Sequence, residues 1–134
     1  MRLSATLGNA AAYLLAADRY QEARNLARES LRHARVVGRT RTVKWTLQHL
    51  AAIAVLSNDR DRKDPTLARA TNLIGFVDGL AGQPAYVRDH TEQQEYDRTI
   101  SVLREVFDDD ELAKLMSAGK EWSEDQAVAE ALAI

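Results

Sequence analysis

The chain has 134 residues, of which 46% are hydrophobic and 28% charged, a balance typical of a soluble globular protein with one core. It contains no cysteine, so disulfides and thiolate metal sites are excluded, and it has no run of about 18 apolar residues that would span a membrane. The net charge is −2, but residues 1–67 carry 12 Lys or Arg against 6 Asp or Glu, whereas residues 68–134 carry 6 against 14.

The start of the chain and the uneven charge bear on location and partners. The N-terminal sequence MRLSATLGN lacks the apolar centre of a signal peptide, so we expect a cytoplasmic protein. Opposite charge in the two halves indicates either an electrostatic partner or two ends of the chain that contact each other.

Two apolar-striped helices are predicted in the first hairpin. The first covers residues 3–17, and Gly8 inside it weakens the helix unless a close helix contact compensates. A turn at residues 18–19 leads to a second helix over residues 20–37, which Gly38 ends as a left-handed C-cap. The stripe expected to face inward in the first helix is Leu3, Leu7, Ala10, Leu14 and Ala17. In the second helix it is Tyr20, Ala23, Ala27, Ser30, Leu31, Ala34 and Val37.

A second hairpin is predicted over residues 40–82. Its first helix would be capped by Thr40 or Thr42 and would end near Asn58. Its wide apolar stripe makes it the most buried helix: Val43, Trp45, Leu47, Leu50, Ile53, Ala54, Leu56 and Ser57. Asp64 followed by Pro65 marks the start of the next helix, which runs to about residue 81 and is ended by Gly82.

Three shorter helices are predicted in the last third of the chain. Capping boxes open two of them, at Thr91 and at Ser123. Between these, residues 108–111 are acidic, and we interpret them as an N-cap and first turn, with a divalent-ion site as the alternative. The sequence therefore predicts seven helices and no strand.

We expect these helices to form one all-α domain, residues 1–134, arranged as a right-handed superhelix. The two hairpins would occupy residues 1–38 and 40–82, and residues 90–134 would supply about three capping helices. Stacked hairpins of this kind form a concave surface that is lined mainly by the first helix of each pair.

The first hairpin resembles a tetratricopeptide repeat (TPR). The resemblance rests on Leu7 and Gly8 in the first helix, Tyr20 near the turn, and Ala23 and Ala27 in the second helix. It implies a TPR-like domain, a scaffold that binds other proteins without catalysis.

The remainder of the chain, about residues 40–133, resembles the C-terminal helical domains of large bacterial ATPase-type (STAND/LuxR-like) regulators. The resemblance rests on residues 67–75 and on the tail Ala118-Gly119-Lys120 with Ser123-Glu124-Asp125-Gln126-Ala127-Val128. It implies the C-terminal TPR-like part of a signalling or transcriptional regulator, or a stand-alone relative of one. The phosphate-binding loop and DNA-binding helices of that family are absent from this sequence.

The TPR resemblance also implies a binding groove. Its lining would be Asn9, Ala12, Tyr13, Leu50 and Ile53, and residues 47–50 offer no Lys or Arg for a carboxylate clamp. Packing against a neighbouring repeat is the alternative for these five residues. The partner would be a protein or upstream domains of the same chain. The broad Ala/Leu face of the first helix is expected to be covered by self-association or by an upstream repeat.

The sequence offers little for catalysis or for a cofactor. His33, His49 and His90 lack metal-ligand spacing, and no nucleophile or phosphate-loop motif is present, so we predict neither enzyme activity, cofactor nor metal. A small-ligand sensor would need an enclosed pocket.

A basic run between Arg28 and Lys44 is the basis of one alternative function. The stripe Arg28, Arg32, Arg35 and Arg39 has the spacing of one helix face and could neutralise phosphates in a nucleic-acid adaptor. A solvated face, or pairing with the acidic second half of the chain, explains the same residues without nucleic acid.

Overall fold

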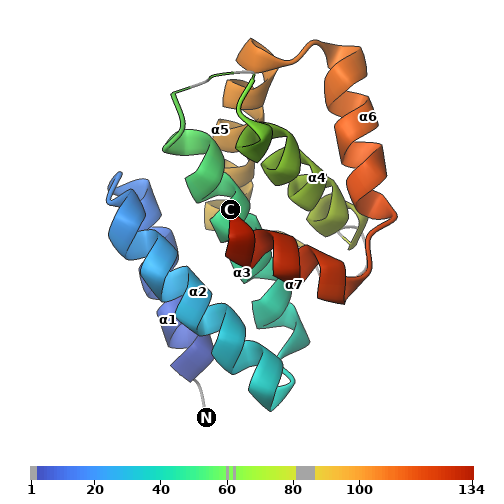
Figure 1. Ribbon diagram of the computed structural model, residues 1–134. Helices are drawn as coiled ribbons and strands as arrows, with labels where there is room; N and C mark the ends of the chain where they lie inside the picture. The colour runs from blue at the N-terminus through green and yellow to red at the C-terminus, as the bar shows by residue number, and fades with distance from the viewer. Residues whose placement is uncertain (1–2, 60, 62, 81–86) are drawn as a thin grey trace.

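The computed structural model describes residues 3–59, 61, 63–80 and 87–134, and the regular structure in these ranges is α-helix, without a strand. Seven helices lie in this part of the chain, as the sequence predicts (Figure 1). Their bounds are α1 Leu3–Ala16, α2 Tyr20–Val37, α3 Thr40–Leu56, α4 Pro65–Leu80, α5 His90–Val106, α6 Asp109–Lys120 and α7 Glu124–Ala133. None of the helices in these ranges is long and apolar enough to cross a membrane.

The helices α1 and α2 form the predicted hairpin, side by side in Figure 1. Asp18 closes the turn with a positive φ of 62°, which an aspartate tolerates better than most residues. Gly38 ends α2 in the left-handed conformation, with φ 73°, as predicted. The buried residues of α2 follow the predicted stripe: Ala23, Ala27, Ser30, Leu31 and Ala34. At its ends, Tyr20 is half-buried and Val37 is exposed.

The buried face of α1 is one position away from the predicted one. Gly8, Ala11 and Leu15 are buried. The predicted stripe is half-buried or exposed at the positions Leu7, Ala10, Leu14 and Ala17, and the Leu3 side chain lies outside the described residues. The helix is apolar almost all round, so its sequence does not select one face. Close packing does, because a Cβ added at Gly8 would lie only 3.3 Å from Oγ of Ser30.

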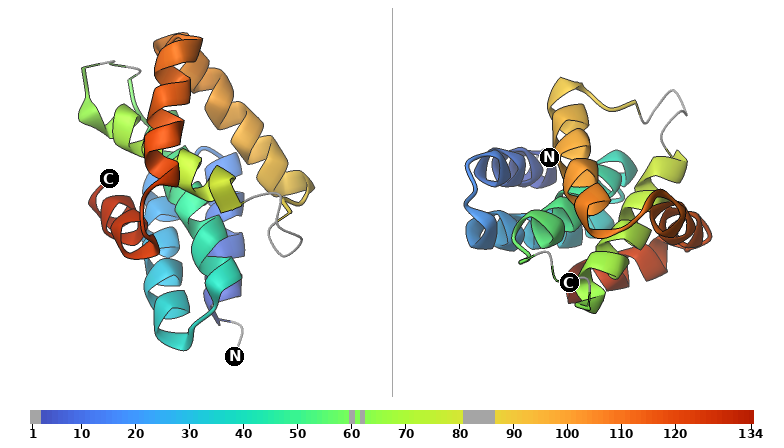
Figure 2. Two further views of the ribbon diagram at one scale, coloured as in Figure 1. Left: turned by 90° about the vertical axis from the view of Figure 1, so that its right-hand side faces the viewer. Right: turned by 90° about the horizontal axis from the view of Figure 1, so that it is seen from above.

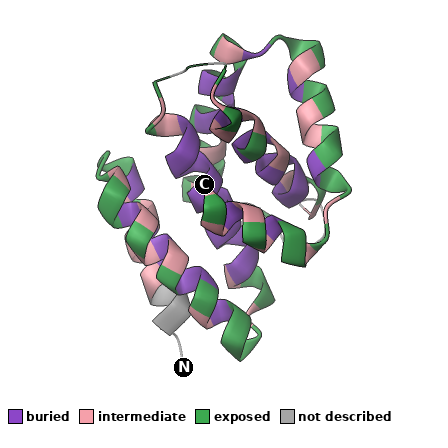
Figure 3. Ribbon diagram, in the orientation of Figure 1, coloured by how far each residue is buried: buried purple, intermediate pink, exposed green. Residues whose placement is uncertain are grey.

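The helix α3 is the centre of the molecule, as its wide apolar stripe predicts. Every residue from Val43 to Val55 is buried (Figure 3). It contacts α1, α2, α4, α5 and α7, and seen from above (Figure 2) α5 lies across it, with the α1–α2 hairpin on one side and α4 on the other. The buried apolar side chains of all seven helices belong to one cluster.

Two predicted N-caps are wrong. Arg39 occupies the N-cap position of α3 and makes no side-chain capping bond, so neither Thr40 nor Thr42 caps this helix. The reason is that α3 begins directly after the Gly38 turn, which places Thr40 already inside the helix. In α5 the cap is Asp89, not Thr91.

In α5 the Asp89 carboxylate accepts a 2.8 Å hydrogen bond from the backbone N–H of Glu92. Aspartate caps at least as well as threonine, so the N-cap lies two residues earlier than predicted. The caps at Asp108 and Ser123 are confirmed by bonds from the backbone N–H groups of Glu111 and Gln126.

The start of α4 is also confirmed, because Asp64 accepts a bond from the backbone N–H of Thr66. The predicted end of that helix, at residues 81–82, lies outside the described residues.

The helices α4 and α6 are in close contact through two glycines. A Cβ at Gly75 would lie 2.1 Å from the carbonyl oxygen of Met116, and one at Gly119 would lie 1.6 Å from that of Asn72. The Asn72 amide donates a 2.7 Å bond to the carbonyl oxygen of Leu115. The helices therefore touch backbone to backbone, which only glycine allows at these two positions.

The basic first half and acidic second half of the chain meet at α7. Arg35 of α2 pairs with Glu124 at 3.0 Å and with Asp125 at 2.6 Å. Contact between oppositely charged parts of the chain, one of the two interpretations of the charge asymmetry, is thus present in the fold. These pairs are largely exposed and each contributes little to stability.

Candidate functional site

A hollow of about 560 Å³ opens between α1, α3 and the first turn of α5. Its lining residues are Gly8, Asn9, Ala12, Tyr13, Ala16, Arg41, Thr42, Trp45, Thr46, His49, Asp89, Thr91 and Glu92. A second hollow of about 200 Å³ adjoins it and is lined by Ala12, Leu15, Ala16, Leu56, Thr91, Gln94, Glu95 and Arg98. Because the two share Ala12, Ala16 and Thr91, they form one elongated depression, which we call the α1–α5 groove.

Helical spacing explains the two long walls of the groove. Residues 9, 12, 13 and 16 recur at intervals of three and four, which places them on one face of α1. Residues 41, 45 and 49 recur every four positions and form one face of α3. Small side chains along the α1 wall leave room between the helices, and two aromatic rings, Tyr13 and Trp45, stand in the lining.

Three of the five predicted binding residues lie in this groove, and two do not. Asn9, Ala12 and Tyr13 line it, with Tyr13 75% exposed. Placing Leu50 and Ile53 in the groove was wrong, since they are 2% and 0% exposed in the core. The face of α3 that carries them is covered by other helices, so a different face of α3 lines the groove.

The sequence-based prediction missed Trp45 and His49 as groove residues, along with the α5 contribution. A signal for the α3 residues was present in the four-residue spacing from Arg41 to His49. The α5 residues Asp89 and Glu92 carried no such signal, because only the fold brings them beside α3.

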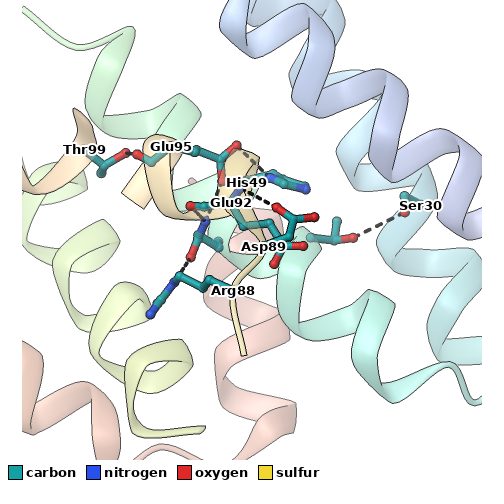
Figure 4. Close-up of polar contacts among 9 residues, drawn as sticks. Ser30, His49, Arg88, Asp89, Glu92, Glu95 and Thr99 are labelled. Atoms are coloured by element: carbon teal, nitrogen blue, oxygen red, sulfur yellow. Dashed lines mark hydrogen bonds and ion pairs between the residues drawn. The ribbon is translucent and has the colours of Figure 1, made fainter. Parts of the chain in front are cut away.

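A buried polar cluster joins α3 to α5 next to the groove (Figure 4). The His49 ring nitrogen Nδ1 donates to the Glu95 carboxylate, 2.8 Å from each oxygen, and both side chains are less than a tenth exposed. The Gln48 amide donates to Glu95 at 2.8 Å and to the carbonyl oxygen of Glu92 at 3.0 Å. Burial lowers the pKa of His49, but the negative charge and hydrogen bond of Glu95 outweigh it, and the net pKa is raised.

Arg88 connects this cluster to α4. Its Nε donates to the Gln48 side-chain oxygen at 2.7 Å, and its Nη1 to Asp78 at 3.2 Å. The guanidinium lies 4.0 Å from the ring centre of Tyr96 and 5.8 Å from that of Trp45, within cation–π range. These contacts fix the first turn of α5, and with it one wall of the groove.

Among the acids that line the groove, Glu92 has the most strongly shifted pKa. Burial, followed by the neighbouring Asp89 carboxylate, raises its pKa to about 7. Its Oε2 atom is buried and has no hydrogen-bond partner. His49 and Arg41 lower the pKa, but the net effect leaves an acid that is partly protonated at neutral pH.

The pKa of Glu92 predicts how stability depends on pH. The folded protein binds a proton here between the ordinary pKa of 4.5 and about 7, whereas the unfolded chain does not, so the free energy of unfolding falls as pH rises through this window. The raised pKa of His49 acts in the same direction. We expect a loss of about 1 kcal/mol from pH 5 to pH 8 after allowing for solvent screening.

Urea denaturation at pH 5, 6, 7 and 8 measures this loss, with Glu92→Gln as the comparison. The variant should show a flatter pH dependence and equal or greater stability at pH 8. An unchanged slope in Glu92→Gln would assign the pH dependence to other groups.

The basic stripe of α2 is not a free phosphate-binding surface along its whole length. Arg35 is engaged by Glu124 and Asp125, and Lys44, at the end of the basic run, is only 8% exposed. Arg28 is half-buried, while Arg32 is exposed. Pairing with the acidic half of the chain therefore accounts for Arg35, one of the four arginines of the stripe.

The described residues contain no group of three or more His, Cys, Asp or Glu side chains placed to bind a metal ion. His33, His49 and His90 lie on three different helices, and the acidic run at residues 108–111 forms the cap and first turn of α6. The groove is lined by aromatic, small and ionisable side chains, without a metal ligand set among the described residues.

Comparison with known proteins gives no match: neither a protein-family model, nor a curated protein, nor a solved structure is significantly similar to this chain.

Proposed function

We propose that this protein is a non-catalytic, TPR-like interaction module that holds a segment of another protein, or of its own upstream domains, in the α1–α5 groove. The observation that carries the proposal is the groove itself. Its two hollows of about 560 and 200 Å³ follow α1, which is the shape an extended segment of chain requires.

The arrangement of the walls supports this proposal. The first helix of each hairpin, α1 and α3, lines the larger hollow, as expected where helical hairpins stack into a concave surface. Tyr13 is 75% exposed, although aromatic side chains usually lie at least partly buried, and it stands at the edge of the groove. Exposed tyrosines in grooves are frequent anchors of protein interfaces.

We further propose that the module is the C-terminal, superhelical part of a bacterial signalling or transcriptional regulator that works in the cytoplasm. The Leu7-Gly8 pair, Tyr20 and the tail from Ala118 to Val128 support this assignment by resemblance. Self-association through α1 would be one way to occupy the groove.

Selection of random 12-residue peptides displayed on phage tests the binding function. The comparison variant is Ala16→Trp, which fills the groove where its two hollows join, at an exposed position outside the core. Ala113→Trp, at an exposed position of α6 outside the groove lining, is the matched control.

Peptides selected on the wild-type protein should bind at least about tenfold more weakly to Ala16→Trp and equally well to Ala113→Trp, since a bulky ring displaces the ligand from the groove. Failure to select any peptide, or equal loss in both variants, would remove the groove as a protein-binding site.

A further inference from the structure

Two carboxylates line the α1–α5 groove without a direct ion pair, although the charges of His49 and Arg41 lie near enough to lower the pKa of Glu92. Asp89 and Glu92 both line the larger hollow, and neither forms an ion pair with any residue that the structure describes. Asp89 accepts the capping bond from the Glu92 N–H and shares a side-chain hydrogen bond with the Glu92 carboxyl group, whereas Oε2 of Glu92 is buried without a partner. A buried carboxylate oxygen without a donor is costly, so this position favours a proton or an incoming cation.

A neighbouring group lacks an acceptor. The Trp45 side chain lines the same hollow and is 8% exposed, yet its Nε1–H has no hydrogen-bond partner. Buried indole N–H groups normally have one. The groove therefore offers an unused donor on α3 and unused acceptors on α5, a pattern that a ligand with both an acceptor and a cationic donor would satisfy.

The shape of the groove restricts that ligand further. Three of the five residues that α1 contributes to the lining are small, Gly8, Ala12 and Ala16, beside Asn9 and Tyr13, and they leave space along the helix. A residue of an extended peptide fits this description, because it carries a carbonyl oxygen in its backbone and, in lysine or arginine, a cation at the end of an apolar stem.

We propose that the α1–α5 groove recognises a Lys or Arg side chain of a bound peptide, with its cationic group against Asp89 and Glu92 and a peptide carbonyl accepting from Trp45. This inference rests on the proposed peptide-binding function and names the residue type that the groove selects. Tyr13 lines the same hollow, and an aromatic ring is a group that a cation can contact.

Two alternatives are weaker on the same observations. Arg41 and His49 line the hollow and lower the pKa of Glu92, but Arg41 is exposed and His49 pairs with Glu95, and neither forms an ion pair with Glu92 or Asp89. A free polyamine would supply cations but no acceptor, and would leave the Trp45 N–H unpartnered.

Binding of a short peptide series tests the inference. The probes are capped Ala-Ala-X-Ala-Ala peptides with Lys, Arg, norleucine or Glu at X, together with spermidine. The readout is the NMR shift of the Trp45 indole N–H in a Trp122→Phe background, in which Trp45 is the sole tryptophan. Norleucine keeps most of the apolar stem of lysine and removes its charge.

The Lys and Arg peptides should bind about tenfold or more tightly than the norleucine peptide, because a charged hydrogen bond in a partly buried site is worth about one factor of ten. That advantage should fall to about twofold or less in Glu92→Gln, which removes the charge while keeping the size. Glu121→Gln, which neutralises an exposed acid outside the groove lining, should retain the full advantage.

The outcomes separate the two proposals. If the norleucine and Lys peptides bind equally, or Glu92→Gln keeps the preference, the groove binds peptides without reading a cation and this inference is overturned alone. If spermidine binds as tightly as the Lys peptide, the site takes free amines and the peptide assignment fails. If no peptide binds, in the series or in the phage selection, the proposed function fails as well.

Discussion

Replacing Gly119 by alanine is expected to destabilise the protein by about 3 kcal/mol. The added Cβ would lie 1.6 Å from the carbonyl oxygen of Asn72 and 2.5 Å from its carbonyl carbon, both backbone atoms of α4 that no rotamer change can move. The helices must separate, which would break the bond from Asn72 to the Leu115 carbonyl. Overpacking of this kind costs more than the helix propensity that alanine gains.

Urea denaturation of Gly119→Ala and of the matched variant Gly79→Ala measures this effect. Gly79 also lies in α4 and faces α6, but a Cβ there meets Cγ of the Lys120 side chain at 3.1 Å, and that flexible chain can move. We expect Gly79→Ala to change the free energy of unfolding by less than about 1 kcal/mol. Equal effects of the two substitutions would show that α4 and α6 do not approach as closely as their backbones indicate.

Replacing Glu95 by alanine is expected to cost about 3 kcal/mol as well, for an electrostatic reason. The substitution would leave His49 and the Gln48 amide without their shared acceptor in a site where His49 is 7% exposed. Removing one partner of a buried pair is strongly destabilising, because the other partner remains desolvated. The pKa of His49 should fall at the same time, since burial alone lowers it.

Chemical denaturation and an NMR titration of the His49 ring test this prediction together. Glu121→Ala serves as the control, because Glu121 is exposed, and we expect it to change stability by less than about 0.5 kcal/mol. A stable Glu95→Ala protein with an unchanged His49 titration would mean that the pair does not hold α5 to α3.

The sequence predicts the helices of this protein well, because each carries local signals. The Gly38 C-cap, the Asp64-Pro65 start and the Ser123 cap depend only on neighbouring residues, and all three are confirmed. The middle of the α2 stripe, from Ala23 to Ala34, is confirmed too, since the polar face of this helix leaves one inward orientation, whereas Val37 at its end is exposed. In α1, by contrast, apolar residues occupy nearly every side, and the inward face depends on how closely α2 approaches Gly8.

The groove could be predicted only in part, because its three walls come from distant parts of the chain. Asn9, Ala12 and Tyr13, which the resemblance to a tetratricopeptide repeat implied, do line the groove, although their role in binding stays a prediction. Leu50 and Ile53 were misplaced because α3 is apolar on most sides, and only the packing of α4 and α5 determines which side stays open. No local pattern relates Glu92 to Trp45, since their meeting depends on the path of the chain between α4 and α5.

The first half of α5 has few apolar anchors, which has a thermodynamic consequence for the groove. The fully buried residues of this helix begin at Thr99, while the polar contacts of residues 90–98 include the bonds of Glu92 and Glu95 with Gln48 and His49 and the 2.7 Å ion pair between Arg98 and Asp18. A segment held this way can detach while exposing little hydrophobic surface, at a lower free energy than global unfolding. Glu92 in this segment lines the groove, and its backbone carbonyl oxygen accepts a hydrogen bond from Gln48 of α3. Ligand binding in the groove and docking of α5 onto α3 are therefore linked equilibria, and each stabilises the other.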